Sequence, residues 1–139
     1  MNVWQQAVQL GGHPGYLVET AQKIFNLLGY SLDICLVRTK PVFSNHWLVK
    51  PEIFEAYVKG LLLPAMQIME NNKEIKALCY QDSNYAQTVR RDEKREPLSP
   101  EQCQRIFERS YYTLHPFICE RLFSTWIAIQ KDLQVSCIL

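Results

Sequence analysis

The fold of this 139-residue chain is decided by residues 115–129, which read HPFICERLFSTWIAI. Apolar residues would cover most of the circumference of a helix formed by this stretch, whereas a surface helix carries them on one side only. We therefore expect a helix that begins at His115-Pro116 and lies at the centre of the hydrophobic core.

Upstream, apolar residues spaced by three and four positions predict further helices. In a helix over residues 14–28, Pro14 suits the first turn and Gly29 the left-handed end. Ser99 is expected to cap another helix, since Gln102 can complete a capping box. The remaining predicted helices cover residues 3–10, begin at Pro51, kink or restart at Pro64, include Ile75 to Cys79, and span Ser83 to Val89.

Three short segments are predicted as strands. Residues 33–38 form an apolar run, residues 43–49 alternate imperfectly between their two sides, and the tail from 133 to 139 is expected to close the sheet. The predicted fold class is therefore α+β, mostly helical, with about five to seven helices and two or three short strands. We expect a single domain over residues 1–139, with a mobile charged loop at residues 90–98.

Composition argues against several classes of protein. The hydrophobic fraction of 47% excludes a wholly disordered chain, and the net charge of +1 argues against binding nucleic acid through bulk charge. No apolar run reaches the roughly 20 residues needed to span a bilayer, and the N-terminus lacks the pattern of a secretory signal. The five cysteines are widely spaced and odd in number, which disfavours a disulfide framework. We therefore expect a cytoplasmic protein.

Few motifs carry chemistry. The three histidines lie far apart, and no His-x-x-x-His pattern or close aspartate pair predicts a metal site. No cofactor is evident either, because a glycine-rich phosphate loop and a nucleophile elbow are both missing. His13 and His115 each precede a proline at the mouth of a predicted helix, where the imidazole either meets a ligand or acts as a cap.

Two polar clusters are candidate sites. Residues 80–85 read YQDSNY and combine hydrogen-bonding groups with aromatic faces, as sugar sites often do. Glu120 and Arg121 lie within the most apolar predicted helix, where a charge must be paired or face a cavity because an unpaired buried ion is costly. Both alternatives, a structural ion pair and a functional one, remain open for this pair.

Two stretches resemble a known family. Residues 43–57 read FSNHWLVKPEIFEAY, which resembles the "aromatic, Asn, aromatic, then Lys-Pro-Glu-aromatic" passage of bacterial glycosyltransferase-like proteins associated with polysaccharide synthesis. Residues 115–126 resemble the later helix of these proteins, with its Glu-Arg-Leu sequence followed by serine and an aromatic residue. In that family both segments belong to the C-terminal, acceptor-facing half of an A-type nucleotide-diphospho-sugar transferase fold.

The resemblance implies a set of functional residues. His115, Glu120 and Arg121 would lie near the sugar-nucleotide diphosphate or the acceptor and are the catalytic candidates. The acceptor cleft would be lined by the candidate substrate-binding residues Asn45, His46, Asp82 and Asn84. The family's nucleotide-binding half has no counterpart in this sequence, so a divalent metal is expected only if a missing upstream half supplies the carboxylates.

Two hypotheses follow. The first is a glycosyltransferase-related domain that acts with a nucleotide sugar and a glycan acceptor, and that is inactive alone because stabilisation of the phosphate leaving group is missing. It predicts one cleft that gathers the candidates His115, Glu120, Arg121, Asn45 and Asp82. The alternative is a small helical module that binds a protein partner or a ligand without catalysis. It predicts that Glu120 and Arg121 are paired and that the histidines are scattered.

Overall fold

The structure, a computed structural model of the chain, describes residues 2–40, 48–88 and 97–133. These residues form α1 (Val3–Gln9), α2 (Tyr16–Leu27), α3 (Pro51–Tyr57), the π-helix η1 (Val58–Leu62), α4 (Leu63–Asn71), α5 (Lys73–Cys79), α6 (Tyr85–Thr88), α7 (Pro100–Phe107) and α8 (His115–Ile129). The prediction of a mostly helical chain is confirmed. Within the described residues, no helix is long and apolar enough to cross a membrane.

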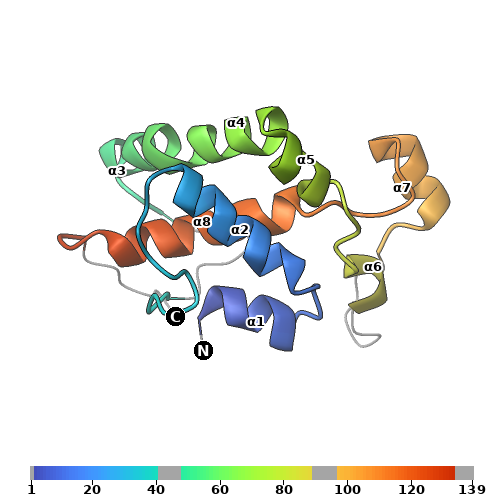
Figure 1. The fold of residues 1–139 in the computed structure, drawn as a ribbon, viewed down its shortest axis with the longest axis horizontal. Helices are drawn as coiled ribbons and strands as arrows, with labels where there is room; N and C mark the ends of the chain where they lie inside the picture. Colours follow the sequence, from blue (N-terminus) through green and yellow to red (C-terminus); the bar gives the residue numbers. More distant parts are fainter. Residues whose placement is uncertain (1, 41–47, 89–96, 134–139) are drawn as a thin grey trace.

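Helix α8 lies at the centre of this arrangement. It runs through the middle of the molecule, between α1 and the row formed by α3, η1 and α4 (Figure 1). It packs against α1 and η1, while α2 packs against α1, α4 and α5. Eight residues of α8 are buried: Ile118, Arg121, Leu122, Phe123, Ser124, Thr125, Trp126 and Ile127. The prediction of a central, buried helix is confirmed.

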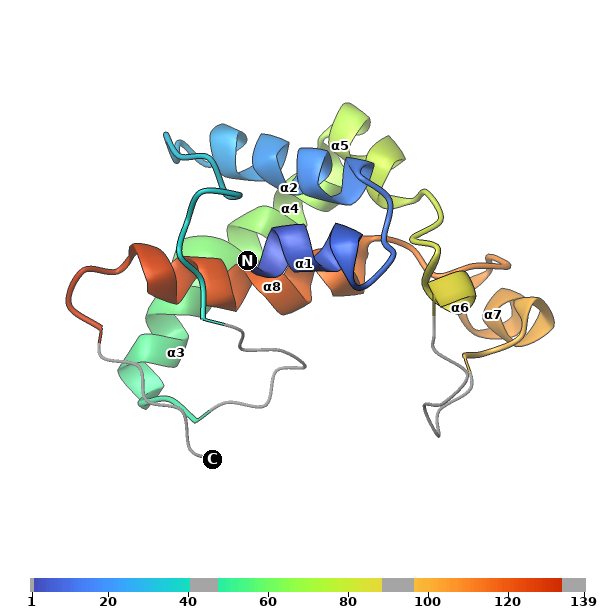
Figure 2. The same cartoon turned by 90° about the horizontal axis from the view of Figure 1, so that it is seen from below.

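Helices α6 and α7 lie together at one end of the molecule, beyond the N-terminal end of α8 (Figures 1 and 2). As predicted, Ser99 caps α7 and forms a capping box with Gln102. Helix α7 ends at Phe107 and is followed by its C-cap Glu108, whose φ of 57° lies in the left-handed region. The chain therefore turns sharply after α7 and returns to α8.

The π-helix η1 has an identifiable cause. Pro64 has no N–H, and its ring would clash with the carbonyl of Gly60 in a regular α-helix. The helix widens instead, and the N–H of Leu63 bonds the carbonyl of Val58, five residues earlier. The helical path therefore continues from α3 through η1 into α4 across the proline.

The predicted strand at residues 33–38 is wrong, and no strand occurs among the described residues. The Asp33 carboxylate accepts the N–H of Cys35 at 2.8 Å, and the Asp33 carbonyl accepts that of Leu36 at 3.0 Å, so the segment turns. Its carbonyls are satisfied by a side chain, because Asn2 Nδ2 donates to Ile34 O at 2.5 Å and to Val37 O at 3.2 Å. A neighbouring strand is not needed to satisfy these groups.

Three other predictions fall largely outside the described residues. They are the strand at 43–49, of which only residues 48 and 49 are described, the closing strand at 133–139, and the charged loop at 90–98.

Polar contacts between α1 and α8 add specificity to their apolar packing. The indole Nε1 of Trp4 donates to Thr125 Oγ1 at 2.8 Å, and both residues have no exposed surface. The Arg121 Nε donates to the carbonyl of Val3 at 3.2 Å. These two bonds join the start of α1 to successive turns of α8.

We expect Thr125→Val to lower the free energy of unfolding by about 1–3 kcal/mol, because the indole N–H of Trp4 loses its acceptor in a dry core. Thr125→Ser is the control, since it keeps the hydroxyl and removes one methyl group. Urea denaturation measures both variants. Equal stability of Thr125→Val and the unmodified chain would contradict this account of the α1–α8 contact.

Candidate functional site

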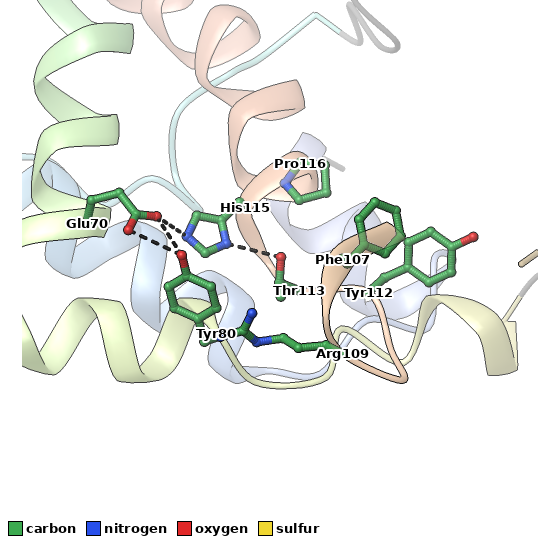
Figure 3. A pocket seen from close by; sticks show the side chains of 8 residues that line it. All are labelled: Glu70, Tyr80, Phe107, Arg109, Tyr112, Thr113, His115 and Pro116. Carbon is green, nitrogen blue, oxygen red and sulfur yellow. Dashed lines mark hydrogen bonds and ion pairs between the residues drawn. The ribbon is translucent and has the colours of Figure 1, made fainter. Parts of the chain in front are cut away.

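A pocket of about 350 Å³ lies where α8 begins (Figure 3). It is lined by Glu70 from α4, Tyr80 after α5, Phe107 at the end of α7, the connecting residues Arg109, Tyr112 and Thr113, and His115 and Pro116 of α8. Residues that are far apart in the sequence therefore share one cavity.

Backbone hydrogen bonds bring the two connecting segments together. The N–H of Leu114 donates to the carbonyl of Cys79 at 2.9 Å, and the N–H of Ser83 donates to that of Tyr112 at 2.8 Å. The hydroxyl of Tyr111 also donates to Tyr80 O at 2.8 Å. These hydrogen bonds thus hold the segment after α5 against the segment before α8, and both segments contribute residues to the pocket.

The Glu70 carboxylate is the centre of a polar network in this pocket. The Tyr80 hydroxyl donates to its two oxygens at 3.0 and 3.2 Å, and Lys76 Nζ lies 3.2 Å away. His115 Nε2 lies 3.1 Å from Glu70 Oε1, which is close enough for an ion pair when His115 is protonated. The buried Nε2 has no hydrogen-bond partner among the described residues. His115 Nδ1 lies 3.1 Å from Thr113 Oγ1. Figure 3 shows Glu70, His115 and Thr113 in a row.

The environment sets the charges of these groups. Burial lowers the pKa of His115, and the nearby Glu70 carboxylate opposes this shift only in part. Burial alone would raise the pKa of Glu70, but hydrogen bonds from Lys76 and Tyr80 bring it below its ordinary value. Near neutral pH, His115 is therefore mainly uncharged and Glu70 is ionised.

Arg109 supplies a cation on the other side of Tyr80. Its guanidinium carbon lies 4.2 Å from the centroid of the Tyr80 ring, within the range of a cation–π interaction. Lys76 Nζ lies 5.7 Å from the same centroid. Around this ring there are thus two cations, Arg109 and Lys76, and one carboxylate, Glu70.

The structure places the predicted catalytic residues in two different surroundings. His115 lines the pocket, whereas Glu120 and Arg121 do not. Arg121 is only 5% exposed and donates to the carbonyls of Val3 and Phe117 and, at 3.1 Å, to Glu120 Oε2. The Glu120–Arg121 pair is therefore tied into the α1–α8 packing.

The two predicted substrate-binding residues that the structure describes, Asp82 and Asn84, do not line this pocket. The Asp82 carboxylate accepts the N–H of Asn84 at 2.8 Å, in a turn where Asn84 has a φ of 58°. The Asp82 carbonyl accepts the Tyr16 hydroxyl, and neither Asp82 nor Asn84 lines the pocket. Asn45 and His46 lie outside the described residues.

His13 has a structural position. It is 6% exposed, its ring packs 4.4 Å from that of Phe117, and its Nδ1 lies 2.9 Å from Ser83 O. Because a carbonyl only accepts, Nδ1 carries the proton in this contact. His13 therefore joins the loop before α2 to the segment after α5.

Sequence reasoning missed Glu70, Arg109 and Thr113 as members of the site. The polar aromatic run at residues 80–85 pointed to Tyr80, but Glu70 and Arg109 had no distinguishing neighbours in the sequence. Among the described residues, no group of three or more His, Cys, Asp or Glu side chains is arranged to hold a metal ion.

No protein-family model matches the chain, and no curated protein or solved structure matches it. The functional conclusion therefore depends on the chemistry of the pocket.

Replacing Glu70 by glutamine should lower the pKa of His115 further. The Glu70 carboxylate attracts the protonated imidazole and so raises the pKa of His115. Without this charge, the lowering of the pKa by burial is no longer opposed by Glu70. A pH titration of the His115 ring protons by NMR measures the shift. Glu74→Gln is the matched control, because Glu74 pairs with Lys23 and does not line the pocket. A His115 pKa that stays constant or rises in Glu70→Gln would refute the contact.

The free energy of unfolding should fall as the pH drops below about 6.5, the ordinary pKa of histidine. Burial lowers the pKa values of His13 and His115 in the folded chain, so the unfolded chain binds more protons in this range. The contribution of these histidines to the free energy of unfolding is therefore fully present above this pH. It is lost as the pH falls towards their pKa values in the folded chain. Urea denaturation at pH 7.5 and 5.5 measures the change. His115→Gln should make the dependence shallower, and an unchanged slope would exclude His115 as a contributor.

Proposed function

We propose that this chain is the acceptor-side part of a glycosyltransferase-like protein and that the pocket at the start of α8 binds a sugar. The observation that supports this proposal is the combination, in one pocket, of aromatic rings with converging polar groups. We assign sugar binding to these residues. Transfer itself would require a donor-binding half.

The apolar part of the pocket suits the faces of a sugar ring. Tyr80, Phe107 and Tyr112 line it together with Pro116, and the Phe107 and Tyr112 rings lie 5.7 Å apart between centroids. An aromatic face is electron-rich, so it favours contact with the weakly positive C–H groups of a sugar ring. These side chains would hold the ring without regard to its hydroxyl pattern.

The polar part of the pocket suits the hydroxyl groups of a sugar. Glu70 offers acceptors, and the hydroxyl of Thr113 both accepts and donates. The volume of about 350 Å³ is near the lower end of small-molecule sites, roughly 300–1,000 Å³. The pocket therefore suits one or two sugar rings better than a long glycan chain.

The family resemblance adds to this proposal through His115, the first residue of the resembling helix, which lies in the pocket. In this proposal His115 touches the sugar, whereas Glu120 and Arg121 position α8 through their contacts with α1. The network of Glu70, His115 and Thr113 is suited to orienting a sugar hydroxyl, since the Glu70 carboxylate accepts hydrogen bonds and the Thr113 hydroxyl, which lies beside His115 Nδ1, can accept or donate one.

A second candidate function is a ligand-binding module without catalysis. The pairing of Arg121 with Glu120 at 3.1 Å favours it, because this is the arrangement expected when the pair has a structural role only. Both candidates use the same pocket and differ in whether a sugar is the ligand.

We expect at least one sugar to shift the backbone ¹⁵N–¹H signals of Tyr80 and Thr113 in an NMR titration of the chain. The panel contains the methyl glycosides of glucose, galactose and mannose, together with methyl glucuronide and galacturonide. Glu70→Gln should weaken the binding about tenfold, because a hydrogen bond to a charged group contributes about 1.5–3 kcal/mol.

Glu74→Gln is the control and should bind like the unmodified chain. If no member of the panel, neutral or acidic, shifts the pocket signals at millimolar concentration, the sugar-binding proposal is wrong and the second candidate is favoured.

A further inference from the structure

Arg109 is the one strongly charged group of the pocket that the binding of a neutral sugar does not require. We infer that the sugar is acidic: it carries a carboxylate or a phosphate, and Arg109 binds this anion. The inference rests on the proposed function and names the substrate class of the same pocket.

The guanidinium of Arg109 is held in place before any ligand binds. Its carbon lies 4.2 Å from the centroid of the Tyr80 ring, in a cation–π contact, and the Tyr80 hydroxyl in turn donates to Glu70. A cation–π contact does not use the N–H donors of the guanidinium, which can therefore still bind an anion. A preorganised fork of this kind suits a carboxylate or a phosphate.

Within the described part of the chain, Arg109 forms no ion pair, whereas the other charged groups around Tyr80 are compensated. Glu70 lies 3.2 Å from Lys76, so these two opposite charges neutralise each other. His115 is mainly neutral because it is buried. The positive charge of Arg109 is therefore left over, and an anionic ligand would complete the charge balance of the pocket.

The groups that would bind the two parts of the ligand lie at different parts of Tyr80. The hydroxyl of Tyr80 lies beside Glu70 and His115, while the face of its ring carries Arg109 (Figure 3). The hydroxyl groups of the sugar would meet Glu70, His115 and Thr113, and its acidic group would meet Arg109. A hexuronate or a sugar phosphate has both kinds of group on one small body.

The test compares sugars that differ only in charge. The dissociation constants of methyl β-D-glucoside and methyl β-D-glucuronide, or of the matching pair for galactose if that sugar binds better, are measured by NMR at low salt. We expect the glucuronide to bind at least tenfold tighter, and its advantage to shrink as salt screens the partly exposed Arg109. Glucose 1-phosphate is the second acidic ligand, and the tighter of the two identifies carboxylate or phosphate as the preferred anion.

Arg109→Gln should abolish the preference for the acidic sugar and leave the affinity for the neutral glycoside within about twofold. Arg105→Gln is the matched control, because Arg105 lies on the neighbouring α7 but does not line the pocket. Circular dichroism and the midpoint of thermal unfolding check that both variants fold like the unmodified chain.

Each outcome separates this inference from the proposed function. Equal affinities for the neutral and the acidic sugar, or a preference that survives in Arg109→Gln, would overturn the inference while sugar binding stands. Inorganic phosphate that binds as tightly as glucose 1-phosphate would also overturn it, since Arg109 would then be a simple anion site. A chain that binds no sugar of either kind would refute the proposed function itself.

Discussion

The structure depends on the burial of α8 and on the partners that its polar groups find. A central helix with Arg121, Ser124 and Thr125 in the core is stable only if these groups are hydrogen-bonded, because unpaired buried polar groups are costly. Helix α1 supplies partners through the carbonyl of Val3 and the indole of Trp4. These contacts fix α8 against the chain's N-terminal region. They also fix the position of His115 at the mouth of the pocket.

Local signals in the sequence were sufficient for most of the helices. The capping box of Ser99 and the apolar circumference of residues 115–129 each predicted a helix that the structure contains. The strand at 33–38 was wrong for a physical reason: a short apolar run does not distinguish a strand from a turn. Asp33 favours the turn because its carboxylate accepts the N–H of Cys35. Asn2, more than 30 residues away in the sequence, stabilises the turn by donating to carbonyls of the segment.

The candidate site was harder to predict than the fold. His115 could be singled out because it precedes a proline at a helix start, and Tyr80 because it begins a polar aromatic run. Glu70 and Arg109 gave no such signal, since tertiary packing brings them to opposite sides of Tyr80. Glu120 and Arg121 drew attention as charges in an apolar helix. Arg121 meets this requirement for partners at the carbonyls of Val3 and Phe117, away from the pocket lining.

The π-helix η1 has a consequence for the direction in which Glu70 points. A π-turn holds one more residue than the α-turn it replaces, and one residue corresponds to about 100° of rotation in an α-helix. The face that α4 presents is therefore offset from that of α3 by this angle. A variant lacking one residue between Val58 and Leu62 would direct the Glu70 carboxylate to another side of the molecule. The extra residue of η1 thus sets which face of α4 carries Glu70 towards Tyr80 and His115.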